Sequence, residues 1–357
     1  MSVPRLAVAG RRGIIQRYFE HLPVSQATPI VTLDEGDTPL IYSQRLSEEI
    51  SAEVWLKYEG LNPTGSFKDR GMTLAMSKAL EEGARAVVCA STGNTSASAA
   101  AYAGRAGLVC AVLIPESDVA LGKLAQALVH GARVLQIDGN FDRALELVRE
   151  LANRRPITIV NSVNPYRIEG QKTGAFEIVE ALGRAPDVHV MPVGNAGNIT
   201  AYWRGYRQAA GIGWCAGTPA MIGVQAAGAD PLVRGEPIAQ PRTAATAIRI
   251  GKPASWAQAI DAARHSGGRI VSVPDAAIAE AYRSLAGEGV FVELASAASV
   301  AGLRHIQRAG LVPGGATVAC VLTGHGLKDP DWSIATGPKP RRVGGEVDAI
   351  LNALGLD

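Results

Sequence analysis

The segment GLNPTGSFKDRG, residues 60–71, places one lysine directly after a Gly-Ser turn and in the first turn of a predicted helix. The positive end of a helix and removal from water both disfavour a charged amine, so we expect a lowered pKa for Lys68. A neutral lysine amine can form a Schiff base with a carbonyl group. Most lysines are solvated surface charges, so other residues must support this interpretation.

Two further loops follow apolar segments and suit anions. Residues 91–96, STGNTS, place five hydrogen-bonding side chains around one glycine. One such residue would serve as a helix cap, whereas five indicate a nest for a carboxylate. In GNAGN, residues 194–198, two glycines allow backbone N–H groups to approach a phosphate at a helix start, although a plain strand-to-helix turn remains an alternative. Neither GxxxxGK nor GxGxxG occurs here, which favours one phosphate over a nucleotide.

Two more loops complete the pattern. Asn161 and Arg167 lie in NSVNPYRIEGQKTG, residues 161–174, where the arginine is either a surface charge or a second anion clamp. In TGHGLKD, Thr323 ends a strand with a hydroxyl, and His325 is either catalytic or solvated. A reactive lysine, a monophosphate cradle, a hydroxyl and amide loop and a strand-end hydroxyl together describe a site for pyridoxal phosphate (PLP).

The elements that must position these loops alternate between short apolar strands and longer helices, which predicts βαβ units and parallel sheets. About ten strands are too many for one sheet of ordinary width, so two α/β lobes are expected. The predicted strands are 54–59, 85–90, 108–115, 133–138, 157–161, 187–194, 220–228, 269–274, 290–293 and 317–324. The predicted helices are 67–83, 94–107, 121–131, 141–154, 170–183, 198–210, 275–289, 295–310 and 346–355.

Composition excludes several classes of protein. A net charge of +2 with dispersed basic residues argues against nucleic acid as a partner. No apolar run reaches the length of about 18 residues that a membrane span requires. The four cysteines form no CxxC pair, and three lie in apolar runs, which favours reduced thiols in a cytoplasmic protein without a metal site. Residues 1–20 lack the order of charge and apolar run that marks a secretory signal.

Four motifs in this order resemble those of PLP enzymes with the tryptophan-synthase-β fold (fold type II). They are NPTGSFKDRG, STGNTSAS, GNAGN and TGHGLKD. Further similarity in EGDTPL (35–40), NSVNPYRIEGQKT (161–173) and VFVELASAASVAGL (290–303) points to the shorter, bacterial-type threonine synthases. The resemblance covers residues 35–329. It implies conversion of O-phospho-L-homoserine and water to L-threonine and phosphate. A threonine or serine dehydratase of the same fold type is the alternative.

The resemblance also implies a role for each motif residue. Lys68 would bind PLP and then act as the acid and base of the reaction, flanked by Phe67. Asn94 would bind the 3′-oxygen of the cofactor, and Thr323 would face its ring nitrogen. The PLP phosphate would be held by Gly194, Asn195, Ala196, Gly197, Asn198 and Ile199. The substrate would meet Ser91, Thr92, Thr95 and Ser96, and its phosphate would be held by Asn161 and Arg167 with help from Asn195.

The same resemblance implies the organisation of the chain. Residues 1–77 would form the first part of a large lobe that includes the PLP lysine, and 78–156 would form an inserted small α/β lobe. Residues 157–330 would complete the large lobe, and 331–357 would form a C-terminal tail with one helix. The fold type suggests a homodimer.

Overall fold

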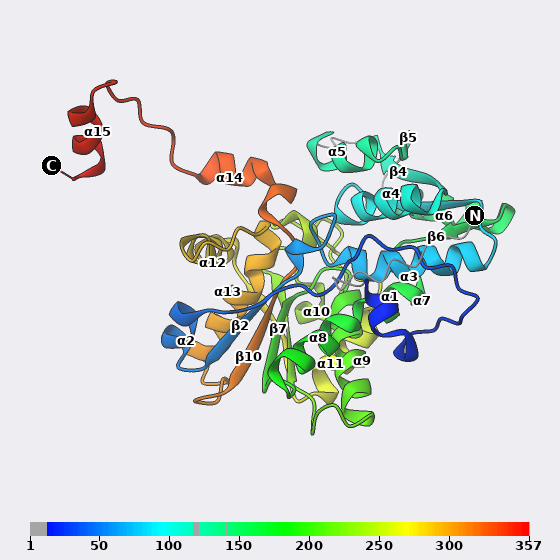
Figure 1. The fold of residues 1–357 in the computed structure, drawn as a ribbon, viewed down its shortest axis with the longest axis horizontal. Helices are drawn as coiled ribbons and strands as arrows, with labels where there is room; N and C mark the ends of the chain where they lie inside the picture. Colours follow the sequence, from blue (N-terminus) through cyan, green and yellow to red (C-terminus); the bar gives the residue numbers. More distant parts are fainter. Residues whose placement is uncertain (1–12, 117–120, 140, 357) are drawn as a thin grey trace.

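The computed structural model of the chain describes residues 13–116, 121–139 and 141–356, and in them two parallel-rich sheets are each covered by helices (Figure 1). The six-stranded sheet has the order β1-β2-β10-β7-β8-β9, with only β1 antiparallel to its neighbour, and the four-stranded sheet has the order β5-β4-β3-β6. This confirms the expected α/β class with two open sheets. The strands are β1 (Leu40–Tyr42), β2 (Glu53–Tyr58), β3 (Ala86–Ala90), β4 (Val109–Pro115), β5 (Arg133–Ile137), β6 (Ile157–Ile159), β7 (Val188–Pro192), β8 (Ala220–Ala226), β9 (Arg269–Val273) and β10 (Thr317–Leu322).

Helices cover both faces of each sheet because the central strands are apolar on both sides. Every residue of β7 and β10 is buried, as parallel strands between two helical layers require. Around the large sheet lie α1 (Ile14–Arg17), α2 (Gln44–Ile50), α8 (Thr173–Leu182), α9 (Gly197–Gly211), α11 (Trp256–His265), α12 (Asp275–Gly287) and α13 (Leu294–Arg308). Around the small sheet lie α3 (Lys68–Glu81), α4 (Asn94–Ala106), α5 (Leu121–Val129) and α6 (Phe141–Arg154).

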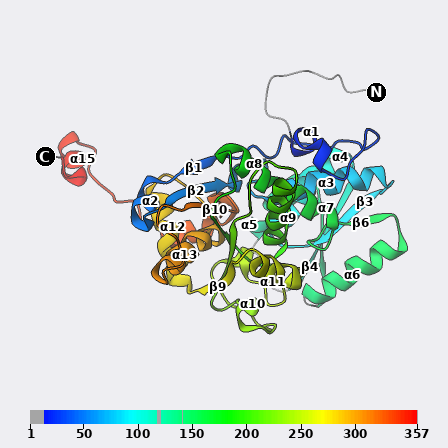
Figure 2. The ribbon, with the colours of Figure 1, turned by 90° about the horizontal axis from the view of Figure 1, so that it is seen from below.

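The remaining elements are short helices in the connections and at the C-terminal end. Figure 2 shows α15 apart from the two sheets, at the end of an extended segment. No helix in the described ranges combines the length and the apolar character needed to span a membrane. These elements are α7 (Pro165–Gln171), α10 (Pro231–Arg234), α14 (Pro330–Thr336), α15 (Val347–Leu354), η1 (Phe19–His21), η2 (Glu59–Leu61), η3 (Thr246–Ile248) and η4 (Gly326–Lys328).

Several elements differ from the sequence-based prediction. The predicted strand 290–293 is wrong. Val292 makes only an isolated bridge with His325, and α13 begins directly after this segment, at Leu294. The predicted helix 170–183 is two helices, since α7 ends at Gln171 and α8 begins at Thr173. The edge strand β1 and the helix α11 were not predicted.

The smaller sheet extends slightly beyond the expected small lobe. Its edge strand β6 follows residue 156, where that lobe was expected to end, and pairs in parallel with β3. The helix α3 lies across the expected boundary at residue 77, and its apolar side chains pack with those of α4. The first part of the large lobe was expected to begin at residue 1, and its residues 1–12 lie outside the described part of the chain.

A buried network of charges joins the large sheet to the start of α3. The guanidinium of Arg70 contacts Glu59 at 2.6 and 2.7 Å and Glu177 at 2.6 and 2.7 Å. The Lys57 amine contacts Glu177 at 2.7 Å and the carbonyl of Thr38 at 2.7 Å. The charges of the two cations and the two carboxylates cancel, and every charged group has several partners. A buried ion cluster needs both conditions to offset the cost of removing its charges from water.

We predict that Glu177→Gln weakens the fold markedly, because the isosteric amide leaves Arg70 and Lys57 buried with too little negative charge. The expected loss in free energy of unfolding is about 3–5 kcal/mol, measured by urea unfolding. Glu146→Gln, which removes one partner of an exposed pair with Arg143, should change the midpoint little. Equal midpoints for the two variants would contradict a role for this network in stability.

Candidate active site

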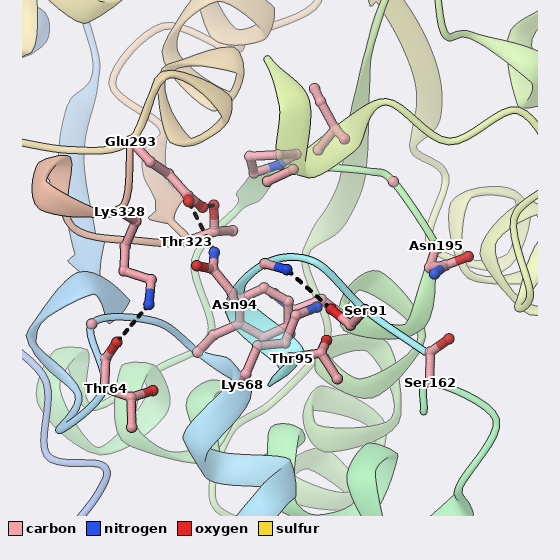
Figure 3. Close-up of a pocket in the computed structure, with 18 of the residues that line it drawn as sticks. Thr64, Lys68, Ser91, Asn94, Thr95, Ser162, Asn195, Glu293, Thr323 and Lys328 are labelled. Atoms are coloured by element: carbon pink, nitrogen blue, oxygen red, sulfur yellow. Dashed lines mark hydrogen bonds between the residues drawn. The ribbon is translucent and has the colours of Figure 1, made fainter. Parts of the chain in front are cut away.

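A cavity of about 930 Å³ lies where the carboxyl ends of the two sheets meet. Loops that follow β2, β3, β6, β7 and β10 line it, so the sequence motifs from distant parts of the chain converge here. Figure 3 shows Lys68, Asn94, Ser162, Asn195 and Thr323 around this cavity. Ligands of open α/β sheets bind at this edge, because strands that run in one direction bring their following loops together.

Backbone hydrogen bonds hold three of these loops side by side. The Phe67 N–H donates to the carbonyl of Thr323 at 3.1 Å, and the Glu293 N–H donates to the carbonyl of Gly324 at 3.0 Å. The loop that carries Lys68 is therefore tied to the end of β10, which in turn is tied to the start of α13. The relative positions of Lys68, Thr323 and Glu293 are set by main-chain contacts and not by flexible side chains.

The Lys68 amine behaves as the sequence indicated. It lies on the cavity wall, 4.1 Å from the centre of the Phe67 ring. Burial and, after it, the positive charge of Arg167 lower the pKa of Lys68 to about 7, and the negative charge of Glu293 opposes the shift. The contribution of burial was expected. That of Arg167 was not, because nothing in the sequence places these two residues together.

Asp69 fixes the turn before Lys68. Its carboxyl oxygens accept hydrogen bonds from the Thr64 N–H at 2.7 Å, the Thr64 hydroxyl at 2.6 Å and the Ser98 hydroxyl at 2.6 Å. Because Ser98 lies on α4, the same carboxyl also joins the lysine loop to the loop at residues 91–96. Asp69 thus holds the Lys68 loop in place relative to the loop at residues 91–96.

The loop at residues 194–198, which was predicted to hold a phosphate, lines the cavity at the start of α9. Ala196 adopts the left-handed conformation with φ 63°, which turns the chain sharply into α9. The N–H groups of the first helical turn, residues 197–199, have no earlier helical carbonyl to bond. Both polar side-chain atoms of Asn198 are buried and have no partner among the described residues. The cavity is lined by all six residues that were predicted to hold the PLP phosphate, namely Gly194, Asn195, Ala196, Gly197 and Asn198 of this loop and Ile199 after it.

Asn94 and Thr323 both line the cavity and share one carboxyl partner. The Asn94 amide donates to Glu293 at 2.9 Å, and the Thr323 hydroxyl donates to the other oxygen of Glu293 at 3.2 Å (Figure 3). The Ser296 hydroxyl lies 3.0 Å from that of Thr323. Glu293 was missed because residues 290–293 resembled a strand, and Ser296 was missed because it lies inside a predicted helix. A carboxylate and a serine beside a buried helix start were the only signal.

Ser91, Thr92 and Thr95 also line the cavity, as expected for residues that meet the substrate. Ser96 does not reach the cavity wall. It is fully buried, and its hydroxyl donates to the carbonyl of Gly93 at 2.7 Å. Its position in the first turn of α4 directs it to its own backbone, as serine often does there.

Asn161 and Arg167 lie together on the side of the cavity formed by β6 and α7. Asn161 makes a two-way amide contact with the backbone of Ala90, at 3.0 and 2.9 Å, and so joins the ends of β6 and β3. Arg167 is buried; its guanidinium donates to the carbonyl of Val160 at 3.2 Å, and its Nε has no partner among the described residues. Burial lowers the pKa of Arg167 to about 10. The cavity therefore holds a buried cation without a bonded carboxylate in the described chain.

His325 and Lys328 are among the residues after Thr323 that also line the cavity. The His325 ring stacks on Tyr58, and its Nδ1 accepts the Leu327 N–H at 3.2 Å, so it caps η4. Burial lowers the pKa of His325. Lys328, which was not predicted, donates to the carbonyl of Thr64 at 3.1 Å and to the side chain of Gln126 on α5. It thus connects the small sheet's helical layer to the lysine loop.

The lowered pKa predicts that Lys68 is acylated at an unusually low pH in protein freed of any bound carbonyl compound. An amine-acylating reagent, with labelling quantified by peptide mass spectrometry, should give a midpoint near pH 7. Lys78 should need far higher pH, because its hydrogen bond to Glu81 raises its pKa. In Arg167→Met the Lys68 midpoint should move upward, since removal of a neighbouring positive charge favours the protonated amine. Labelling of the two lysines with the same midpoint would contradict this assignment.

Comparison with known proteins agrees with this geometry. Residues 31–324 match a family model described as pyridoxal-phosphate dependent enzyme. The threonine synthase of Mycobacterium leprae is 58% identical over 346 residues, which are 96% of each chain. That of Synechocystis is 57% identical over 99% of this chain and 93% of its own, and that of Halalkalibacterium halodurans is 59% identical over 91% and 92%.

Solved structures share the fold at lower sequence identity. Maize serine racemase superimposes with a TM-score of 0.75 at 18% identity and covers 91% of this chain and 97% of its own. The processed form of threonine deaminase isoform 2 from Solanum lycopersicum gives 0.73 at 21%, over 90% and 92%. These likenesses establish the fold, and the family follows from the sequence matches. The chain belongs to the pyridoxal-phosphate dependent enzymes and, within them, to the threonine synthases.

Proposed function

We propose that this protein converts O-phospho-L-homoserine and water to L-threonine and phosphate, the last step of threonine biosynthesis. The observation that carries the assignment of substrate is the buried guanidinium of Arg167, which faces the same cavity as Lys68 and has no bonded carboxylate in the described chain. A phosphate dianion supplies the missing charge. A dehydratase that eliminates a hydroxyl group has no need of this cation, so the synthase activity is favoured.

The residues present fit pyridoxal phosphate. The unpartnered side chain of Asn198 and the free N–H groups at the start of α9 suit its phosphate, and the neutral amine of Lys68 suits its aldehyde. Asn94 and Thr323 would face its phenolic oxygen and ring nitrogen. When bound, the cofactor supplies an electron sink for the electron pair left at Cα of an amino acid.

The side chains of this protein do the rest of the chemistry. Lys68, as a neutral amine, would take one proton from Cα of the substrate and, after passing that proton on, a second one from Cβ. Arg167 would bind the phosphate, with Asn161 and Asn195 beside it, and would stabilise its charge as it leaves Cγ. Water would then give its hydroxyl group to Cβ and its remaining proton to the released phosphate, and Lys68 would return two protons in turn, one to Cγ and one to Cα. Ser91, Thr92 and Thr95 would orient the substrate carboxylate.

We also propose a setting for this activity. Residues 1–77 and 157–330 would form a large lobe, 78–156 a small lobe that closes on the substrate, and 331–357 a tail. Two copies of the chain would associate as a homodimer in the cytoplasm. Support for a reducing compartment comes from the free thiols of Cys89, Cys110 and Cys320, which are buried and whose pKa values burial raises.

Replacement of the lysine tests the assignment of the cofactor site. Lys68→Ala should lose the visible absorbance of the lysine-bound cofactor together with turnover, because it removes the amine that would bind the cofactor. Lys78→Ala, on the outer part of the same helix, should keep both. A visible band that persists in Lys68→Ala would overturn the assignment.

Replacement of the arginine tests the substrate. With O-phospho-L-homoserine, Arg167→Met should lower kcat/KM about a hundredfold or more, since a charge-assisted contact to phosphate is lost. Release of inorganic phosphate is the measurement, and the exposed Arg204→Met is the control. Formation of 2-oxobutyrate from threonine should be slow in the unmodified enzyme. Faster consumption of threonine than of phosphohomoserine would favour the dehydratase.

A further inference from the structure

The side chain of Glu293 lines the cavity, and its carboxyl group has no role toward a ligand so far. It is 5% exposed and precedes the first turn of α13. The backbone of Gly324 packs directly against it: a Cβ atom at position 324 would lie only 2.5 Å from the carboxyl carbon. The glycine of the TGHG segment therefore makes room for this carboxyl group, which indicates that the group belongs in this position.

The two oxygens of Glu293 reach residues that come from the layers of the two different sheets. One accepts the Asn94 amide at 2.9 Å, from the start of α4 in the small-sheet layer. The other faces the Thr323 hydroxyl at 3.2 Å, at the end of β10 in the large sheet. Figure 3 shows Glu293 above these two side chains, on the side away from Lys68.

The chemistry of these groups makes the contact directional. An ionised carboxylate only accepts hydrogen bonds, so Asn94 must turn its NH₂ group, and not its oxygen, toward Glu293. The second N–H of the same amide then remains available to a ligand in the cavity. A hydroxyl has a single proton, so the contacts of Thr323 with Glu293 and Ser296 decide whether its oxygen donates or accepts toward the cavity.

We propose that Glu293 is a positioning residue for the cofactor: by accepting one N–H of Asn94 and facing the hydroxyl of Thr323, it fixes which atoms these two side chains present. The proposal rests on the proposed function, which places Asn94 at the phenolic oxygen and Thr323 at the ring nitrogen of pyridoxal phosphate. Glu293 would thus act on the cofactor through the side chains of Asn94 and Thr323.

The variant Glu293→Gln distinguishes the role of the Glu293 carboxyl group from a purely structural role of its backbone. The main-chain contact of Glu293 with Gly324 does not use the carboxyl group, so the isosteric Glu293→Gln keeps it. The glutamine amide can donate to the Asn94 oxygen and so reverse the Asn94 side chain. The side-chain oxygen of Asn94 would then face the phenolic oxygen of the cofactor, and these two hydrogen-bond acceptors would repel each other.

The test measures cofactor binding and its spectrum in place of turnover. In Glu293→Gln the absorption maximum of the bound cofactor should shift, and its dissociation constant should rise about tenfold or more. Glu288→Gln is the matched control, because that carboxyl group accepts the Ser43 hydroxyl at 2.6 Å and does not line the cavity. It should change neither quantity. Glu293→Asp keeps the carboxylate and should restore part of the spectrum.

A double-mutant cycle separates direct from indirect effects. In an Asn94→Ala background, the further addition of Glu293→Gln should change the dissociation constant far less than it does alone, because its main route of action is gone. Equal effects in the two backgrounds would overturn the proposal, as would an unchanged spectrum and affinity in Glu293→Gln. If the unmodified protein itself forms no visible band with pyridoxal phosphate, the proposed function fails, and the role of Glu293 fails with it.

Discussion

The buried ion cluster around Arg70 is the interaction on which the rest of the site depends. Arg70 lies two residues after Lys68, and its two carboxylate partners come from η2 and α8 of the large-sheet layers. The first turn of α3 is therefore held to the large sheet although the later turns of the helix pack on the small one. Any shift of this turn would separate buried charges, so Lys68 occupies a fixed position between the two sheets.

The lowered pKa of Lys68 follows from the same arrangement. Two charged neighbours act in opposite directions: Arg167 disfavours the ammonium form of Lys68, and Glu293 favours it. Because the pKa of about 7 is a balance between burial and these two charges, the amine is available as a base near neutral pH without being locked in one state. The arginine that would bind the departing phosphate thus also tunes the base, and this links substrate charge to proton transfer.

Sequence patterns reached most of the site because its residues are carried by loops with unusual composition. Lys68, Asn94, the loop at 194–198 and Thr323 all come after apolar strands, and parallel strands bring such loops together whatever their order in the chain. Glu293 could not be recognised in this way. Its function depends on a contact with Asn94 across 199 positions of sequence, and VFVE reads as a strand by side-chain type alone. Ser96 shows the opposite error. It lies in the segment 91–96 at the site and was predicted to meet the substrate, but its hydroxyl donates to the backbone of its own helix start.

The fold shows the same division between local and long-range information. Strands such as β7 and β10 are mostly apolar and buried throughout, so they were predictable. By contrast, β1 is a three-residue edge strand that exists only because β2 offers it a partner. Asn94 begins a helix that covers the small sheet, whereas Thr323 follows a strand of the large sheet, and Glu293 bonds to both residues. The geometry of the site at the meeting of the two sheets is therefore a property of their packing. A variant that alters this packing should change what Asn94 and Thr323 present to a ligand even when every motif residue is intact.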